Sequence, residues 1–246
     1  MIFITGDIHG DPRRFNTESF PEQYEMKKND YVIICGDFGL VWDYRGQNKN
    51  EKYWLDWLEN KPFTTLFVDG NHENHERLNA YTVEEWHGGN VHKIRPSVIH
   101  LMRGQVFDID DKKVFTFGGA RSHDIKDGVL EPDDPKIKEW QNDLFRLFRI
   151  NKRSWWKEEL PVDSELECGR TNLKINNNSV DYIISHSPST RELYALGEKG
   201  PDILTDYLDE ICLSIDYKYH FFGHMHVNQK ITDKDICLFE QIVRIH

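Results

Sequence analysis

The chain has 246 residues, of which 38% are hydrophobic and 13% aromatic, enough for one globular domain with insertions. Its formal net charge of −11 argues against broad, non-specific binding to nucleic acid, which needs a basic surface. No apolar run approaches ~18 residues, so we expect no transmembrane helix and no membrane partner. The N-terminus lacks the pattern of a signal peptide, and the scattered cysteines lack zinc-type spacing. These features predict a cytoplasmic protein with free thiols.

Short apolar runs recur along the chain, each followed by glycine, a carboxylate, asparagine or histidine. They are rich in β-branched and aromatic residues and therefore predict buried strands. The runs are Ile2–Thr5, Tyr31–Cys35, Thr64–Val68, Val114–Phe117, Asp181–Ile184 and His220–Phe222. Helices are predicted between them at Asn50–Glu59, Glu73–Ala80, Pro135–Phe148 and Pro201–Ile211. This alternation predicts an α/β fold, with the polar residues that follow the strands gathered along one edge.

The stretch from Arg121 to Asn178 differs in character from the rest of the chain. It contains Asp133-Asp134-Pro135, Trp155-Trp156 and a run of three asparagines, but no clear strand. We interpret residues 121–178 as a mainly helical insertion within a single domain that spans residues 1–246. Such an insertion either caps the site or forms an ordinary peripheral layer.

A set of potential metal ligands follows the predicted strands. Asp7 and His9 are two residues apart, so on an extended segment their side chains point the same way and reach one cation. His224 and His226 repeat this spacing. The remaining candidates are Asp37, Asn71 and His186. These seven oxygen and nitrogen ligands suit zinc, iron, manganese or nickel better than calcium, and they fit two ions that share one carboxylate.

The order of these motifs resembles that of the calcineurin-like metallophosphoesterase superfamily. The matching motifs are Gly-Asp-x-His at Gly6–His9, Gly-Asp at Gly36–Asp37, Gly-Asn-His-Glu at Gly70–Glu73, His186, and Gly-His-x-His at Gly223–His226. The resemblance implies a four-layer β-sandwich flanked by helices and two divalent metal ions, for which manganese is favoured. It implies that Asp7, His9 and His226 hold one ion. Asn71, His186 and His224 would hold the other, with Asp37 as the bridge.

Two further residues are candidates for contact with a substrate. By resemblance, His72 contacts the phosphate and protonates the leaving oxygen, a task that suits a histidine because its ordinary pKa is near neutrality. Arg121 follows a predicted strand and could reach a phosphate with its guanidinium group, although a surface loop is the alternative. The histidines without a ligand context are expected to be structural or surface residues. They are His75, His87, His92, His100, His220 and His246.

One familiar extension of the family pattern is missing. Many members, among them protein phosphatases and symmetrical dinucleoside tetraphosphatases, carry Gly-Asp-x-Val-Asp-Arg-Gly, whereas this chain has Gly-Asp-Phe-Gly-Leu-Val-Trp at Gly36–Trp42. We therefore expect a two-metal phosphatase or phosphodiesterase that acts on a small phosphorylated molecule or nucleotide, with a metal-bridging hydroxide as the nucleophile. The alternatives are a nuclease-type phosphodiesterase acting on DNA or RNA and a non-catalytic protein-binding scaffold.

Overall fold

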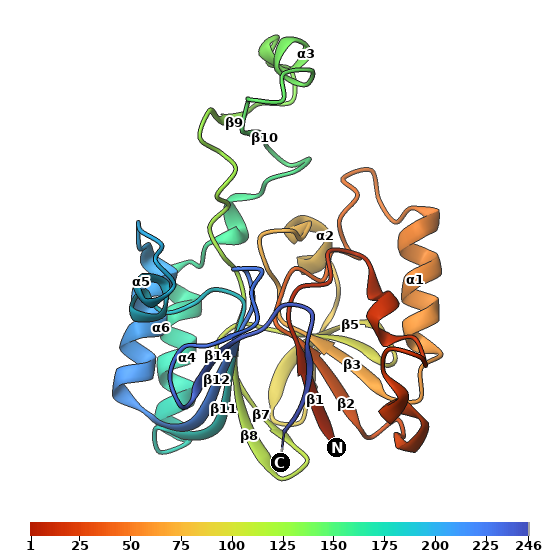
Figure 1. Cartoon of the computed structure of the whole chain (residues 1–246), viewed down its shortest axis with the longest axis vertical. Helices are drawn as coiled ribbons and strands as arrows, with labels where there is room; N and C mark the ends of the chain where they lie inside the picture. The colour runs from red at the N-terminus through yellow and green to blue at the C-terminus, as the bar shows by residue number, and fades with distance from the viewer. Residues whose placement is uncertain (246) are drawn as a thin grey trace.

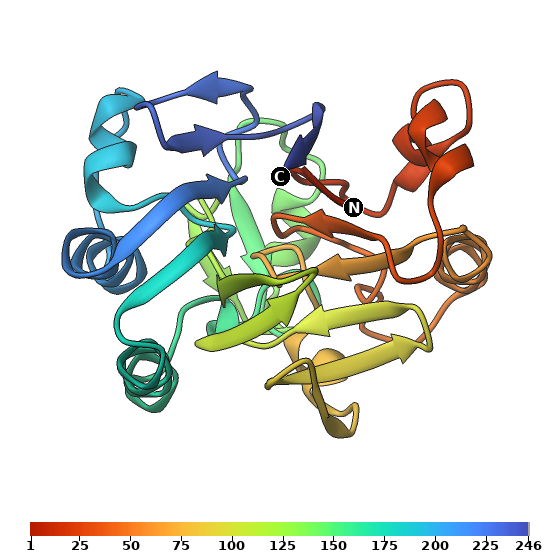
Figure 2. The ribbon, with the colours of Figure 1, turned by 90° about the horizontal axis from the view of Figure 1, so that it is seen from below.

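Two β-sheets pack face to face in the computed structural model, which describes residues 1–245 and leaves His246 outside the description. The first sheet has seven strands in the order β15-β1-β2-β3-β6-β5-β4, and the second has six in the order β13-β14-β12-β11-β8-β7. Helix α1 covers the outer face of the first sheet, while α4 and α6 cover that of the second (Figure 1 and Figure 2). This layering confirms the predicted α/β sandwich flanked by helices.

The elements have the following bounds. The seven-stranded sheet comprises β1 (Ile2–Thr5), β2 (Tyr31–Ile34), β3 (Thr64–Phe67), β4 (Val83–Trp86), β5 (Gly89–Arg95), β6 (Val98–Leu101) and β15 (Ile242–Ile245). The six-stranded sheet comprises β7 (Gln105–Ile109), β8 (Lys112–Phe117), β11 (Ser179–Ser185), β12 (Asp216–Phe222), β13 (Gln229–Lys230) and β14 (Asp235–Cys237). The helices are α1 (Lys49–Glu59), α2 (His75–Asn79), α3 (Lys136–Trp140), α4 (Asp163–Ile175), α5 (Thr190–Ala195) and α6 (Ile203–Ser214).

The central strands are buried on both faces because they lie between the other sheet and a helix layer. In β2, Ile33 packs into the core between the sheets, while Val32 and Ile34 pack toward α1 and its neighbours. Such strands appear in the sequence as continuous apolar runs, which is why they were predictable. The antiparallel strands β4 to β7 were not predicted. In β4 the reason is visible, because three of its four residues are exposed and only Trp86 is partly buried.

Parallel pairing aligns the ends of the strands that precede the candidate ligands. Strands β1, β2 and β3 are parallel and in register, with Thr5 opposite Ile34 and Ile34 opposite Phe67. In the second sheet, β11 is parallel to both β8 and β12. The loops that leave these strands therefore emerge along the edges where α/β proteins place their sites.

The predicted insertion at residues 121–178 divides into two structurally different parts. Helix α4 buries Leu166 and Leu173 against the six-stranded sheet. Residues 125–155, here called the arm, project beyond both sheets (Figure 1) and contain α3 with the short parallel strands β9 (Gly128–Leu130) and β10 (Phe148–Ile150). The sequence analysis expected no strand here and a longer helix at Pro135–Phe148. Helix α3 is short because it buries no residue and has no side-chain cap. No helix within residues 1–245 is long and apolar enough to cross a membrane.

Candidate metal centre

The seven predicted ligands come from both sheets and meet where the rims of the sheets adjoin. Four of them follow strands of the seven-stranded sheet: Asp7 and His9 after β1, Asp37 after β2 and Asn71 after β3. His186 follows β11, and His224 and His226 follow β12, in the six-stranded sheet. The site therefore spans the junction between the two halves of the sandwich.

The side chains of Asp7, His9, Asp37 and His226 form one compact group, in which a donor atom of each lies within 4.8 Å of the others. The Nε2 atoms of His9 and His226 lie 2.9 Å apart. Nε2 of His226 lies 3.2 Å from Oδ2 of Asp7, and Nδ1 of His9 lies 3.7 Å from Oδ2 of Asp37. Two carboxylates and two imidazoles converging in this way fit a divalent transition-metal ion.

A second group of donors lies on the other side of Asp37. Nε2 of His186 lies 3.3 Å from Oδ1 of Asp37 and 3.3 Å from Oδ1 of Asn71. The rings of His186 and His224 have centroids 5.0 Å apart. Asp37 thus faces both groups, with Oδ2 toward His9 and Oδ1 toward His186, as a bridging carboxylate must.

Backbone conformation brings these groups together. His9, Asp37, His224 and His226 all have positive φ, between 44° and 66°, a left-handed conformation that non-glycine residues rarely adopt. Such conformations persist only where the surrounding fold imposes them, and they often mark functional sites.

The glycines beside the ligands have two different roles. Gly36 has a φ of 90° and makes a sharp turn between β2 and Asp37. Gly70 does not have a positive φ. Glycine is needed here because the backbone passes close to the side chain of Asp37, and an added Cβ would lie 2.1 Å from Oδ1 of Asp37.

The electrostatics of the group are those of a site that attracts a cation. Burial raises the pKa of Asp37, but the charge of His186 and its hydrogen bond outweigh burial and hold that pKa below its ordinary range. Burial likewise lowers the pKa of His186, but the charges of Asp37 and Asp7 outweigh it and raise the pKa to about 10. A proton on His186 thus compensates two buried carboxylates, a role that a bound cation takes over. Burial lowers the pKa of His224, which favours the neutral imidazole that binds metals.

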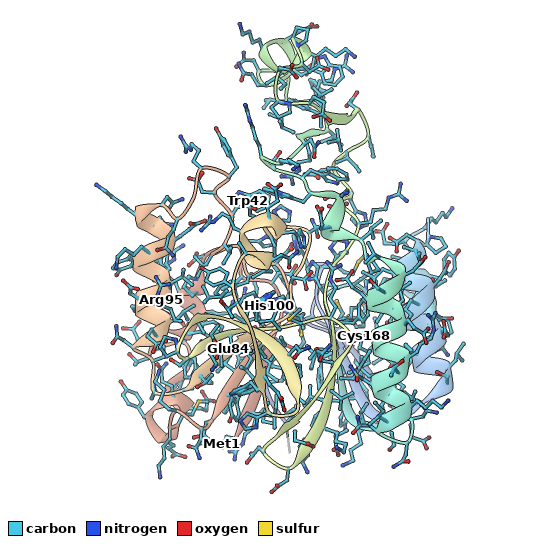
Figure 3. All side chains as sticks on the ribbon, turned by 180° about the vertical axis from the view of Figure 1, so that it is seen from behind. Met1, Trp42, Glu84, Arg95, His100 and Cys168 are labelled. Carbon is cyan, nitrogen blue, oxygen red and sulfur yellow. The ribbon has the colours of Figure 1, made fainter. Side chains whose placement is uncertain are left out.

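His72 lies at the opening of the site. Its backbone N–H donates a 2.7 Å hydrogen bond to Oδ1 of Asp37, and its ring meets that of His9 edge-on with centroids 5.0 Å apart. Burial lowers the pKa of His72, so the ring is neutral near pH 7. Trp42, which the sequence analysis missed, stacks on His72 at a centroid distance of 5.4 Å and an interplanar angle of 26°. Trp42, labelled below the arm in Figure 3, also meets Trp156, with ring centroids 5.4 Å apart and an interplanar angle of 69°.

The loop after β8 also reaches the site. Nε2 of His123 lies 2.6 Å from Nε2 of His224, so this loop contributes a histidine for which the sequence analysis proposed no role. The sequence does contain a signal for His123, because the stretch Ser122-His123-Asp124 follows a predicted strand, as the predicted ligands do. Arg121, the predicted substrate contact, is exposed and lines a cavity that borders His224.

The remaining histidines lie away from the predicted ligand set. His75, His92 and His100 are buried, and Nε2 of His100 lies 3.2 Å from the buried carboxylate of Asp69. His220 is buried with Nδ1 2.8 Å from Oε1 of Glu192. His87 is exposed, with Nδ1 2.7 Å from the carbonyl oxygen of Asp108. His246 lies outside the described residues.

The fold and the order of these motifs define a class of protein. A family model described as calcineurin-like phosphoesterase matches residues 1–228, so the chain belongs to this family of metal-dependent phosphoester hydrolases.

Among curated proteins, the chain is similar to the lariat debranching enzyme of Danio rerio, at 21% identity over 240 residues that cover 92% of this chain and 40% of the relative. It is also similar to lariat debranching enzyme A of Xenopus laevis, at 22% identity over 92% of this chain and 42% of the relative. The lariat debranching enzyme of Schizosaccharomyces pombe is 22% identical over 82% of this chain and 44% of the relative. The chain thus spans less than half the length of these relatives.

Proposed function

We propose that the chain hydrolyses phosphoesters with two divalent metal ions, of which manganese is the favoured identity. The observation that supports this most directly is the position of Asp37, whose two oxygens face two separate sets of nitrogen and oxygen donors. In this assignment Asp7, His9 and His226 hold one ion. Asn71, His186 and His224 hold the other. Asp37 is a ligand of both ions.

Two divalent ions held by these residues would supply an activated water as the nucleophile and would offset charge on the phosphoryl oxygens. The chain's own residues orient the substrate and handle the proton of the leaving group. His72 borders the same opening as Asp37, Asn71 and His224, which supports a contact between its ring and a phosphate bound there. We assign His72 to contact the phosphate and, once protonated, to donate a proton to the leaving oxygen.

A metal-loaded activity screen tests this function. The purified chain would be stripped of metal, reloaded with Mn²⁺, Fe²⁺, Zn²⁺ or Ni²⁺, and assayed with p-nitrophenyl phosphate and bis(p-nitrophenyl) phosphate. Metal-dependent hydrolysis of either compound is expected. Tight binding of metal without hydrolysis of any phosphoester would contradict the proposal and would favour a protein-binding scaffold instead.

A small phosphorylated molecule or nucleotide is the first candidate substrate, and an RNA phosphodiester is the second. The second candidate is supported by the similarity to lariat debranching enzymes and by the arm, which adds surface beside the site. Trp156 at the base of the arm contacts Trp42, which stacks on His72. Comparing cleavage of linear RNA, branched RNA and free nucleotides separates the two candidates.

A further inference from the structure

A second cavity lies beside the candidate metal centre. It has a volume of about 290 Å³ and lies between the loop after β8, the loop after β11 and the start of α6. Its wall includes His123 and His224, which also line the opening above Asp37 and Asn71. The two spaces are therefore neighbours that share two wall residues, and one ligand can occupy both.

Three cationic side chains border this cavity: Arg121, Lys126 and Lys199. All three are exposed, and none makes a hydrogen bond, ion pair or ring contact with another described residue. Arg121 is exceptional in this respect. Every other arginine in residues 1–245 contacts a carboxylate, a carbonyl oxygen or an aromatic ring.

The carboxylate in the cavity wall does not neutralise these cations by direct contact. Asp202 lines the cavity, but its Oδ1 accepts hydrogen bonds from the backbone N–H groups of Leu204 and Thr205 and so caps α6. Asp124, in the adjoining opening, forms an ion pair with Arg149. The cavity thus presents three unpaired cations on an otherwise acidic protein, and a phosphate has the charge and the acceptor oxygens to engage them.

We propose that this cavity binds a second phosphate of the substrate, next to the phosphoester that is hydrolysed. The proposal rests on the proposed function and adds a substrate class, namely molecules that carry a further phosphate beside the scissile one. The second phosphate is either a terminal monoester or the next diester of a strand, and both present the same oxygens to Arg121, Lys126 and Lys199. The cavity therefore selects among phosphoesters and takes no part in the bond cleavage.

Competitive inhibition provides the test. The wild-type chain hydrolyses bis(p-nitrophenyl) phosphate in the presence of adenosine 3′,5′-bisphosphate or adenosine 5′-monophosphate. The inhibition constant of the bisphosphate is expected to be roughly tenfold lower than that of the monophosphate. This is the gain typical of one additional group of charge-assisted hydrogen bonds. In an Arg121→Ala/Lys199→Ala variant the two inhibition constants should agree within about twofold.

Lys174→Ala is the matched control, because Lys174 is exposed, its side chain makes no hydrogen bond, ion pair or ring contact with a described residue, and it lies on α4 away from the cavity lining. In this variant the ratio of the two inhibition constants, which measures the advantage of the bisphosphate, should be the same as in the wild type. Lys126→Glu is a second, independent variant and should also reduce that advantage. Equal inhibition by the two nucleotides in the wild type, or an advantage that survives in both cavity variants, would overturn the proposal.

Three oligonucleotides identify the source of the phosphate. Faster cleavage of a 5′-phosphorylated dinucleotide than of an unphosphorylated dinucleotide indicates a terminal monoester. Faster cleavage of an unphosphorylated trinucleotide indicates an internal diester. If neither the phosphorylated dinucleotide nor the trinucleotide is cleaved faster than the unphosphorylated dinucleotide, the cavity does not bind a second phosphate of the substrate. If the wild type hydrolyses neither p-nitrophenyl phosphate nor bis(p-nitrophenyl) phosphate with any metal, the proposed function itself is wrong.

Discussion

The Nε2 atoms of His9 and His226 lie 2.9 Å apart although 217 residues separate them in the chain. One follows β1 and the other β12, so each comes from a different sheet. Both imidazoles lie near the buried carboxylate of Asp7, and the ring of His226 also stacks on Phe239 at a centroid distance of 4.8 Å. We propose that a bound cation holds the two imidazoles and the carboxylate together, and the first prediction below tests that proposal.

Asp37→Ala should remove both metal ions, since Asp37 faces both donor groups. Hydrolysis should fall by at least about 100-fold, because the ions generate the nucleophile. Metal content measured by inductively coupled plasma mass spectrometry checks the result. Asp233→Ala, at an exposed carboxylate, is the control and should keep both ions. Two tightly held ions in the Asp37 variant would show that it is not the bridge.

His72→Ala should keep most of the bound metal and lose activity by about 10²-fold to 10⁴-fold, the range for losing a positioned proton donor. The readout is kcat together with metal content in the same preparation. The loss should be smaller for p-nitrophenyl esters than for alkyl phosphoesters, because p-nitrophenolate needs little protonation to leave. Full activity in the metal-loaded variant would remove His72 from the mechanism.

Trp42→Ala should lower kcat by about tenfold, because Trp42 fixes the ring of His72 and small displacements of a reacting group are costly. Metal content should not change, since Trp42 contacts no predicted ligand in the described residues. Trp42→Phe should recover much of the activity because it restores a stacked ring. If both variants lose metal or unfold, Trp42 is structural and does not position His72.

Arg103→Ala should destabilise the fold by about 3–5 kcal/mol, because it leaves the buried carboxylate of Asp69 without its main partner. Nε of Arg103 donates a 3.0 Å hydrogen bond to Oδ2 of Asp69, and both side chains are almost fully buried. Urea unfolding with a chelator present measures the change without a contribution from metal. Arg13→Ala, which breaks the exposed pair with Asp11, should have a far smaller effect.

Replacing residues 128–146 with two glycines should leave the melting temperature nearly unchanged. The N–H of Asp127 donates a 2.9 Å hydrogen bond to the carbonyl oxygen of Leu147, so the ends of the removed segment are already adjacent. Leu144 and Phe145 are more than 90% exposed, and Leu130 is the only buried residue in the segment, so the loss of apolar burial is small. Hydrolysis of bis(p-nitrophenyl) phosphate should persist. If RNA is the substrate, its cleavage should fall; unchanged cleavage would show that the arm does not contact it.

The candidate ligands could be proposed from the sequence because each signal is local. Asp7, Asp37 and Asn71 follow apolar strands within a few residues and each has glycine before it, a pattern that can be read without knowing the fold. Trp42 could not be predicted in this way, because its importance depends on His72 and Trp156, which only the tertiary structure brings to it. The two strands of the arm were not predicted, for a related reason. Its strands β9 and β10 pair residues that are 20 positions apart, such as Gly128 and Phe148, and lack the alternation that marks a sheet packed on a core.

The pairing of β1 with β15 has a consequence for how the protein forms. Strand β1, which leads into Asp7, has β2 on one side and β15 on the other, with Ile2 opposite Ile245. During synthesis the strand beside Asp7 thus remains an open edge until residues 242–245 have left the ribosome, and His224 and His226 emerge only shortly before them. Contacts this distant in sequence slow folding. The candidate ligand set is therefore complete only after His226 has left the ribosome.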